Sequence, residues 1–572
     1  MHRPPASLER WALALLAAAM LVLAPTSARG DAAGLAAALV RARDGHVAES
    51  HGWRRLIHYR PGFWNGDLSE LDGMSFFLGR DGRHLPDEEL EATLRGFFAA
   101  QVRGREDEHA LCRFPARHLF LARHLPEVAA LPEPRCPKLA RYLAAVDTDF
   151  VSLVYASNYL SNPGSALGHT FLRLGRKQPP GSKEPAERLD YGVEYEVDAS
   201  TRNPLLYTVR GLGGGFEGRI VFRTFEYKAL EYGVHNDRDL WEYRLALSRE
   251  EIELLVAHLW EVSRSFVRYY YLTENCSYHV LALLEAVTPR IDVLGERKSL
   301  LIPTDTVKAV ARIPGIVSEV QYRASVKARV ERERDEKPRG LPRDKAPDLG
   351  HGSLRATVGA GATSQFEAGF AALGFRMSFH DLGDPPDGNP ELLQLQFLDT
   401  QLRARLSDSE VSLDRLTFAE LLALSPLRST AKAPSWRVRG MGIRLHDEGC
   451  SDCFVHGPNL SMGLTLATPD ERVAVWVMAD SYALFPGNFD DIGGTFARWG
   501  IGPYAGLRLN LPGSLVLVAS GTWSWLPAQT PTRVFDLRAT LRSPIARDVA
   551  LGFEGAAQPE SVEGVFTSYL YF

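Results

Sequence analysis

Cys276 is the residue of this sequence that is best placed to act as a nucleophile. The chain has five cysteines: Cys112 and Cys136 share one region, Cys450 and Cys453 form a C-x-x-C pair, and Cys276 is left over. Cys276 directly precedes an apolar helical pattern, so we expect its sulfur at a helix N-terminus, where backbone N–H groups and the helix dipole favour the thiolate. The same N–H groups could bind the oxyanion that forms when the thiolate attacks a carbonyl carbon.

A thiol nucleophile needs a base, and His169 is the candidate. It begins a predicted strand over residues 169–174, and Glu194 lies on the next predicted strand, residues 191–197. Glu194 could accept the second imidazole N–H and fix the tautomer of His169. Taken alone, a cysteine is more often an inert small hydrophobe, and a lone histidine is more often a surface or core residue. Their order along the chain, followed by a cysteine without an evident partner, favours a Cys–His acyl-transfer centre.

The residues around these positions resemble a known superfamily. A histidine, then a polar residue on the following strand, then Asn-Cys at a helix start is similar to the circularly permuted NlpC-like papain fold. The sequence NCSYH at 275–279 resembles the Asn-Cys-Glu-His-Phe motif of lecithin–retinol acyltransferases. The closer resemblance is to the Lnb family, the periplasmic domain of a bacterial lipoprotein N-acyltransferase. It covers roughly residues 145–300 and is carried by SNPGSALGHTFLR at 161–173, RDLWEY at 238–243 and YYYLTENCS at 269–277.

This resemblance implies a mechanism and a set of site residues. Cys276 would attack an acyl ester of a phospholipid with His169 as base, and an amine such as a lipoprotein N-terminus would then take the acyl group from the thioester. The family more often carries Asn at the position of Glu194, so the orienting role of Glu194 departs from the family pattern. Residues flanking the sulfur are expected to bind substrate, although the tyrosines among them could equally line the core: Asn275, Ser277, Tyr270 and Tyr271.

Two other functions stay open. With water as acceptor the domain would be a cysteine hydrolase, either an amidase or a lipase. A non-enzymatic barrel or scaffold with a binding periplasmic domain is the third possibility, because fold analogy cannot choose the chemistry. The net charge of −5 and the absence of a basic helix argue against a nucleic-acid partner.

No metal and no other cofactor is expected. Cys276 and His279 could ligate zinc together with His169, but a fourth ligand is not evident. Cys450 and Cys453 are expected to form a disulfide in a polar loop rather than a redox site, because a thioredoxin-like setting is lacking. Cys112 and Cys136 are expected to form a second disulfide.

The N-terminus determines the compartment in which these groups would act. Arg3 and Arg10 precede an apolar run over residues 11–23, and Thr26-Ser27-Ala28 follows with small residues at the cleavage spacing. This pattern predicts a secretory signal peptide over residues 1–28. A transmembrane anchor is the alternative, but the run is shorter than the roughly 20 residues that a bilayer requires. Export permits disulfides.

The candidate site is expected in an α+β domain over residues 146–310, preceded by a helical region over 29–145. Ser248 and Glu251 form a capping box ahead of one amphipathic helix, and a second helix is expected from Cys276. The glycine-rich stretch 211–215 predicts a mobile loop. A phosphate cradle is a weak alternative for it, because the lysine and helix of a P-loop are missing.

Residues 311–350 are expected to link this domain to the last one. The stretch 325–350 is rich in Arg, Lys, Glu, Asp and Pro, so it cannot bury much apolar surface. A short solvated helix is the alternative to a linker.

From residue 351 to residue 572 the hydrophobic period changes to two. About twelve segments alternate in this way, and the chain ends on Phe572, which resembles the terminal signal of bacterial outer-membrane proteins. Apolar-out, polar-in strands of this length predict an antiparallel transmembrane β-barrel, although a soluble β-sandwich also alternates. We therefore predict an outer-membrane protein whose catalytic domain lies in the periplasm. One clear example of the alternation is formed by Phe535, Leu537, Ala539 and Leu541 between polar residues.

Overall fold

The computed structural model describes residues 31–572 except for 62–65, 159–166, 178–187, 198–200, 202, 296–300, 327–328, 330–341, 343–344, 366–368, 428–432, 487–496, 528 and 530. The predicted signal peptide, residues 1–28, lies outside the described residues. None of the helices in the described part has the length and hydropathy needed to cross a membrane. The chain packs into two compact units, one of Met1–Ser152, Phe171–Glu226 and Leu245–Ser299, the other of Leu153–Thr170, Tyr227–Arg244 and Leu300–Phe572.

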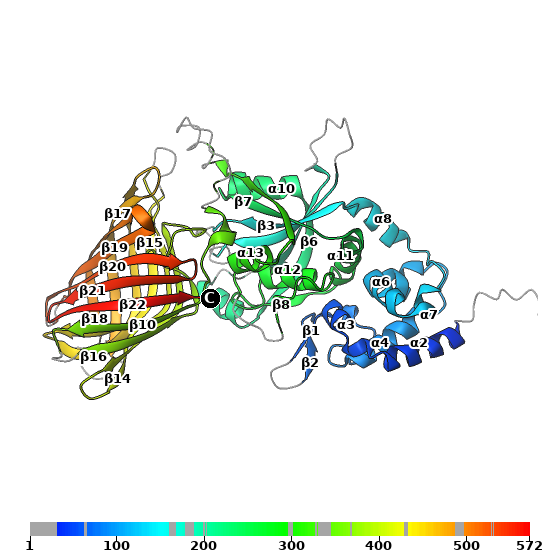
Figure 1. The fold of residues 1–572 in the computed structure, drawn as a ribbon, viewed down its shortest axis with the longest axis horizontal. Helices are drawn as coiled ribbons and strands as arrows, with labels where there is room; N and C mark the ends of the chain where they lie inside the picture. The colour runs from blue at the N-terminus through cyan, green and yellow to red at the C-terminus, as the bar shows by residue number, and fades with distance from the viewer. Residues whose placement is uncertain are drawn as a thin grey trace, which may run out of the picture. The chain divides into compact units, whose positions relative to one another are not determined.

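The N-terminal part of the first unit is helical apart from one short hairpin (Figure 1). Helix α4 begins at Pro86, and Asp87 and Glu88 in its first turn match the positive end of the helix dipole. Arg117 on α6 is fully buried and forms ion pairs with Glu89 and Glu261. The elements are α2 (Ala32–Asp44), α3 (His51–Leu56), β1 (Tyr59–Pro61), β2 (Asp67–Ser69), α4 (Pro86–Phe97), α5 (Ala110–Arg113), α6 (Pro115–His124), α7 (Pro126–Ala129) and α8 (Pro137–Val146).

The region that follows is α+β, as predicted. Among the described residues, a seven-stranded sheet has the order β8-β6-β5-β4-β3-β7-β9. Its strands are β3 (Phe150–Ala156), β4 (His169–Gly175), β5 (Tyr191–Val197), β6 (Phe216–Thr224), β7 (Leu240–Leu245), β8 (Val267–Tyr269) and β9 (Val317–Arg323). The helices are α9 (Pro204–Leu212), α10 (Phe225–Leu230), which continues into a π-helical turn (Glu231–His235), α11 (Arg249–Val262), α12 (Cys276–Glu285) and α13 (Pro303–Ala311). The predicted capping box of Ser248 and Glu251 begins α11.

Two sequence predictions need correction here. The stretch 211–215 was predicted as a mobile loop, but its first residues belong to α9, and Gly214 turns the chain towards β6 with φ +71°. The segment 311–350 was predicted as a linker, but it contains β9, an edge strand of the sheet. The composition of 311–350 concealed this strand because most of its side chains are solvent-exposed.

The C-terminal part of the second unit is a closed antiparallel barrel (Figure 1). Twelve strands of the described residues form it, and β12 (Ser378–His380) adds a short pairing to β13. Closure comes from β11 against β13 and from β10 against β22, so a sandwich is excluded. The strands are β10 (Arg355–Thr363), β11 (Phe370–Arg376), β13 (Leu393–Arg405), β14 (Val411–Ala423), β15 (Ser435–Asp447), β16 (Cys450–Ala467), β17 (Val473–Pro486), β18 (Arg498–Leu511), β19 (Leu515–Trp525), β20 (Arg533–Ala546), β21 (Val549–Gln558) and β22 (Ser561–Tyr571).

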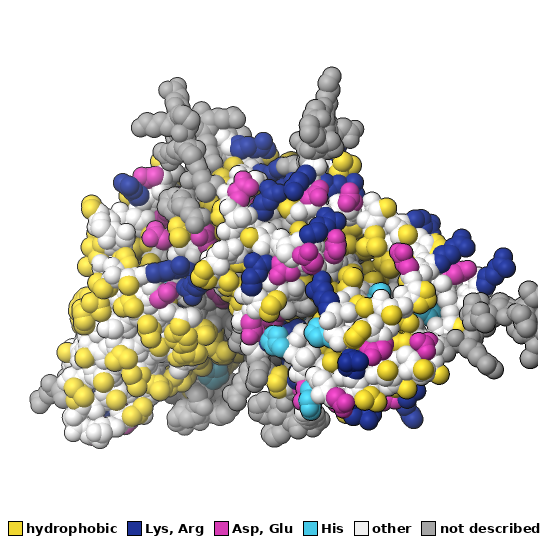
Figure 2. Space-filling view, turned by 45° about the vertical axis from the view of Figure 1, so that its right-hand side comes forward, with side chains coloured by type: hydrophobic (Ala, Val, Ile, Leu, Met, Phe, Trp, Pro, Cys, Tyr) yellow, Lys and Arg dark blue, Asp and Glu magenta, His cyan; other side chains and the backbone are white. Residues whose placement is uncertain are grey.

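The outer face of the barrel is apolar and its interior is polar. On β16, Leu460, Met462 and Leu464 are more than half exposed, whereas Asn459, Ser461 and Thr465, which point to the other face, are buried. Figure 2 shows hydrophobic side chains gathered over the outside of the barrel. A soluble protein would not expose such a surface, whereas hydrocarbon chains cover it in a membrane. The protein is therefore an outer-membrane protein with a periplasmic domain.

Candidate active site

The first turn of α12 carries the candidate nucleophile, and Asn275 caps it. The Asn275 Oδ1 accepts hydrogen bonds from the backbone N–H groups of Ser277 at 3.0 Å and Tyr278 at 3.3 Å. Its Nδ2 donates to the carbonyl oxygen of Tyr271 at 3.1 Å. Asparagine is a favoured N-cap because its side chain satisfies donors that the helix leaves unpaired. Asn275, predicted to bind substrate, thus has a structural role at the start of the helix.

Cys276 is 4 % exposed, and its sulfur is not part of a disulfide. Its backbone N–H donates to the hydroxyl of Tyr269 at 3.0 Å, and its Sγ lies 4.0 Å from the Oγ of Ser277. The N–H groups of residues 276–278, expected to be available to an oxyanion, therefore all have partners here. Binding of an oxyanion by these groups requires Tyr269 or Asn275 to yield its hydrogen bond.

Tyr269 contacts the candidate nucleophile, and the sequence did not single it out from the other two tyrosines of the run. Burial raises the pKa of Tyr269 well above its usual value, and the neighbouring Cys276 raises it further, so the phenol remains a hydrogen-bond donor at neutral pH. The available signal was weak: in β8 the buried residues Val267 and Tyr269 alternate with the exposed Arg268. A three-residue strand is too short for such alternation to single out one tyrosine of three.

An aromatic cluster surrounds the thiol. Cys276 packs with the buried residues Phe216 and Tyr269, and with partly buried Tyr207 and Tyr271. The Tyr271 ring lies 5.4 Å from that of Tyr207 and 6.2 Å from that of Phe216, measured between centroids. Tyr271, predicted to bind substrate, thus belongs to the wall around the sulfur.

Tyr270, the fourth predicted binding residue, packs on the turn after α9. A Cβ at Gly214 would lie 2.3 Å from the Tyr270 ring, and one at Gly211 would lie 2.0 Å from the Tyr271 ring. Glycine at both positions is required by these close approaches. The glycine stretch therefore brings α9 against the tyrosines that precede Cys276.

Glu194 and His169 lie on adjacent strands of the sheet. Glu194 is in the middle of β5, where it is 2 % exposed and pairs with Val221 of β6. Helix α12 packs against β5. His169 begins β4 and is half-buried, with its ring 5.9 Å from that of Tyr232. Gly168 before it has φ +94° and no room for a side chain beside Tyr155, so the turn into β4 requires glycine.

His279 does not contribute to a three-ligand metal group with Cys276 among the residues that the structure describes. Its ring packs on that of Tyr195 at 4.8 Å, and it is 1 % exposed.

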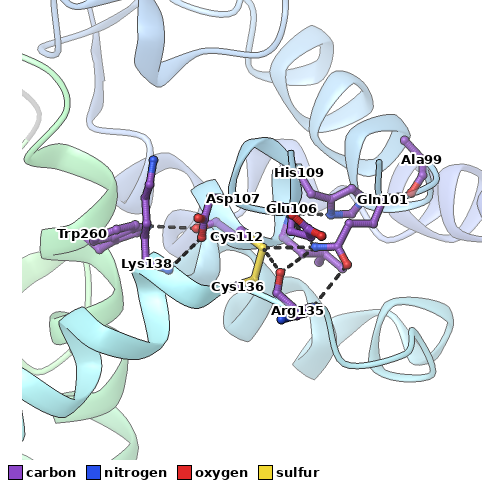
Figure 3. Close-up of a disulfide and its surroundings, with 11 residues drawn as sticks. Ala99, Gln101, Glu106, Asp107, His109, Cys112, Arg135, Cys136, Lys138 and Trp260 are labelled. Atoms are coloured by element: carbon purple, nitrogen blue, oxygen red, sulfur yellow. Dashed lines mark hydrogen bonds between the residues drawn. A yellow bond between two sulfur atoms is a disulfide. The ribbon is translucent and has the colours of Figure 1, made fainter. Parts of the chain in front are cut away.

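Cys112 and Cys136 are joined by a disulfide with a Cα–Cα distance of 5.3 Å (Figure 3). The Nε2 of Gln101 donates to the carbonyl oxygen of Arg135 at 2.8 Å, next to the bond. The indole N–H of Trp260, on α11, donates to the carbonyl oxygen of Cys112 at 2.9 Å. The predicted polar loop is wrong, because Cys450 and Cys453 both lie in β16; the predicted bond itself lies outside the described residues, because the side chain of Cys450 is not described.

Three family models match the chain. Residues 138–312 match the Lnb N-terminal periplasmic domain, residues 344–570 match a domain of unknown function (DUF7840), and residues 45–124 match another (DUF7843). A comparison with curated proteins gives no match.

Solved outer-membrane proteins match part of the chain. The KdgM porin in complex with disordered oligogalacturonate is 7 % identical, with 38 % of this chain and 99 % of that chain covered and a TM-score of 0.24. The NanC porin is 8 % identical, with 38 % and 98 % covered and a TM-score of 0.25. A loop-deletion mutant of OmpT, an outer-membrane protein of Vibrio cholerae, is 7 % identical, with 39 % and 100 % covered and a TM-score of 0.20. The chain thus joins a segment similar to the Lnb periplasmic domain to an outer-membrane barrel.

Proposed function

We propose that this protein is a membrane-tethered thiol acyltransferase that moves an acyl chain from a phospholipid to an amine, the N-terminus of a lipoprotein. The observation that carries the proposal is the Cys276 thiol at the N-terminus of α12, inside the segment that matches the Lnb periplasmic domain. We assign the chemistry to residues 146–310 and the tether to residues 351–572.

The proposed reaction has two half-reactions. His169 takes the proton of the Cys276 thiol, and the thiolate attacks the ester carbonyl of the phospholipid. The C–O bond breaks, the leaving alcohol takes the proton from His169, and an acyl thioester remains on Cys276. An amine then attacks the thioester, an amide forms, and the proton that the amine loses restores the thiol.

His169, the proposed base, and Glu194, its proposed orienting partner, are related by strand alternation. In the antiparallel pair of β4 and β5, Arg173 lies opposite Gly192. Residues two apart on a strand share a face, and residues opposite one another share it too. His169 and Glu194 therefore belong to one face of the sheet, and Tyr195, whose ring packs on that of His279 in α12, belongs to the other. The proposed proton transfer therefore requires the His169 ring to reach the sulfur past the start of β4, where His169 lies.

The surroundings of Cys276 suit an acyl chain. The aromatic residues of the cluster present apolar surface beside the sulfur, and burial of methylene groups stabilises a bound chain by about 0.8 kcal/mol for each group. The hydroxyl of Tyr269, next to the backbone N–H of Cys276, is a donor that can follow the developing oxyanion. The barrel supplies continuous access to lipid, because it keeps the domain at the membrane.

Intact-mass analysis tests the proposal. Full-length protein in detergent is incubated with a phosphatidylethanolamine of known acyl composition. We expect an added acyl mass that maps to Cys276, is absent in Cys276→Ala, and forms at least a hundredfold more slowly in His169→Ala. His235→Ala, which changes an exposed histidine, is the matched control.

Addition of a lipopeptide with a free N-terminal amine then separates transfer from hydrolysis. Release of N-acylated lipopeptide supports the transferase, whereas release of free fatty acid alone makes the protein a hydrolase. The absence of any adduct on the wild-type protein, with every lipid tried, would make the periplasmic part a binding domain and overturn the proposal.

A further inference from the structure

His351, His380 and Asp384 form a buried cluster at one end of the barrel, far in sequence from Cys276. They are 2 %, 0 % and 0 % exposed. Among the described residues, this is the group of histidine, cysteine and acidic side chains whose ligand atoms come close enough to hold one ion. Sequence analysis predicted no metal, and none of the three residues was singled out there.

The three atoms define a triangle of the size that a metal ion needs. The Nε2 of His351 lies 3.2 Å from the Nδ1 of His380, and the Oδ2 of Asp384 lies 3.8 Å from each nitrogen. The point equidistant from all three is therefore about 2.1 Å from each, which matches zinc–nitrogen and zinc–oxygen bond lengths. A hydrogen bond between the two imidazoles explains the first distance. The Oδ2 of Asp384 accepts from Arg376 at 2.7 Å and from the backbone N–H of Asp381 at 2.9 Å, and these contacts hold it 3.8 Å from each imidazole nitrogen.

We propose that these three residues bind a divalent first-row transition metal, with Zn²⁺ as the ion that fits best. Two imidazoles and one carboxylate are a common ligand set for such ions. The second ring nitrogen of His351, Nδ1, lies 2.7 Å from the carbonyl oxygen of Gly352. A proton on Nδ1 directs the lone pair of Nε2 towards the cluster, as outer hydrogen bonds do for metal-bound histidines.

Arginines and carboxylates surround the cluster in equal number. Four arginines contact the four carboxylates of this group, because Arg415 also lies 4.0 Å from Glu554, so the group is neutral before a metal is counted. Asp384 itself accepts from Arg376 at 2.7 Å and from Arg542 at 2.8 Å. The remaining members are Arg355, Asp381, Asp399 and Glu554.

The backbone that carries His351 is held firmly. Its carbonyl oxygen accepts a hydrogen bond from the Nζ of Lys308 at 2.6 Å. A Cβ at the following residue, Gly352, would lie 2.4 Å from the backbone nitrogen of Phe572, so glycine permits this close approach. Leu354 and Phe572 then exchange two backbone hydrogen bonds of 3.0 Å. The ligand is thus fixed where the chain enters the barrel.

The other two ligands belong to a segment that folds into the barrel. His380 ends β12, and Asp384 lies in the loop before β13. Leu382 of this loop packs with Trp476 and Tyr504 from the barrel wall, and its carbonyl oxygen accepts from the Nε of Arg508 at 2.9 Å. A metal bound to all three ligands would therefore join the first residues of the barrel to the loop inside it.

The test uses full-length protein in detergent, stripped with EDTA and dialysed against metal-free buffer. Titration with Co²⁺ is followed by visible absorption, and bound Zn²⁺ is measured by mass spectrometry of the metal. We expect one equivalent of metal per wild-type chain, and at least a tenfold weaker affinity in His380→Gln and in Asp384→Asn. His456→Gln, which changes an exposed histidine of β16, and Cys276→Ala should bind as the wild type does.

A second measurement covers variants that fail to fold. For the wild-type protein, Zn²⁺ should raise the temperature at which the barrel unfolds, and EDTA should lower it. The proposal is overturned if the stripped wild-type protein takes up no cobalt at micromolar concentration, or if Asp384→Asn binds as tightly as the wild type. The first result would leave a hydrogen bond between the two imidazoles as the full account of the cluster.

Discussion

The hydroxyl of Tyr278, two residues after the candidate nucleophile, donates a hydrogen bond to the carboxylate of Glu70. The two residues are 208 positions apart in the sequence, and both are buried. Arg60 lies 3.6 Å from the same carboxylate and 2.7 Å from that of Glu285. Tyr278 and Glu285 are near opposite ends of α12, so the residues around the N-terminal hairpin hold this helix at two points.

Removal of the Tyr278 hydroxyl should loosen α12. Burial and the Glu70 carboxylate raise the pKa of Tyr278, so its hydroxyl stays protonated and donates throughout the neutral range. Tyr278→Phe takes a donor from a buried carboxylate and should cost about 1–3 kcal/mol of stability. Urea unfolding of the full-length protein measures this cost, and Tyr227→Phe, at an exposed tyrosine, is the control. Equal stability of the two variants would show that the bond does not hold the helix.

Acidification should destabilise the first unit through His58 and His258. Their Nε2 atoms lie 2.9 Å apart in the core, and burial lowers the pKa of His58 to about 4. Burial and the neighbouring His58 lower the pKa of His258 further. An unfolded histidine binds its proton near pH 6.5, so between pH 6.5 and about 4 the unfolded chain holds more protons. The contribution of the two histidines to the free energy of unfolding is therefore fully present above pH 6.5. It is lost as the pH falls, by at most about 1.4 kcal/mol per pH unit for each histidine.

The measurement must separate this effect from that of Glu261. Burial raises the pKa of Glu261 to about 7, which acts with the opposite sign because the folded state then holds the extra proton. We therefore expect the difference in unfolding free energy between the wild type and His58→Gln to shrink as the pH is lowered from 7.5 to 5. A difference that stays constant over this range would contradict the prediction.

Loss of the Cys112–Cys136 disulfide should lower the stability of the N-terminal helices. The bond closes a segment of 24 residues, for which about 2–4 kcal/mol of stabilisation is expected. The double variant Cys112→Ser, Cys136→Ser should unfold at lower denaturant concentration than the oxidised wild type. Added reductant should lower the midpoint of the wild type and leave that of the double variant unchanged.

Substitutions of Asn275 should separate its capping of α12 from the effect of charge beside Cys276. Asn275→Ala removes the acceptor for two N–H groups and should cost about 1 kcal/mol, whereas Asn275→Asp keeps the cap. The added carboxylate lies beside Cys276, so in Asn275→Asp we expect the thiol to be alkylated by iodoacetamide with a pH profile shifted upwards. An unchanged profile, with stability retained, would mean that the sulfur does not sense charge at the cap.

The sequence by itself determined the features that depend on neighbours along the chain. Alternation with period two predicted the barrel, because each strand turns successive side chains to lipid and to the interior. A cap residue followed by an apolar helical pattern predicted that Cys276 begins a helix, since capping involves residues two or three apart. Pairing the cysteines that lie near one another in the sequence left Cys276 over, and the structure leaves it outside the Cys112–Cys136 disulfide.

Only the tertiary structure decided which distant groups meet. The contact of Tyr278 with Glu70 and the triangle of His351, His380 and Asp384 join residues that no periodic pattern relates. The role of Tyr269 and the edge strand β9 were missed because their signals are short or mainly solvent-exposed. Hydrophobic periodicity indicates which face of a helix or strand is buried. The partner of a buried polar group depends instead on how the helices and strands pack, and no local pattern in the sequence predicts that packing.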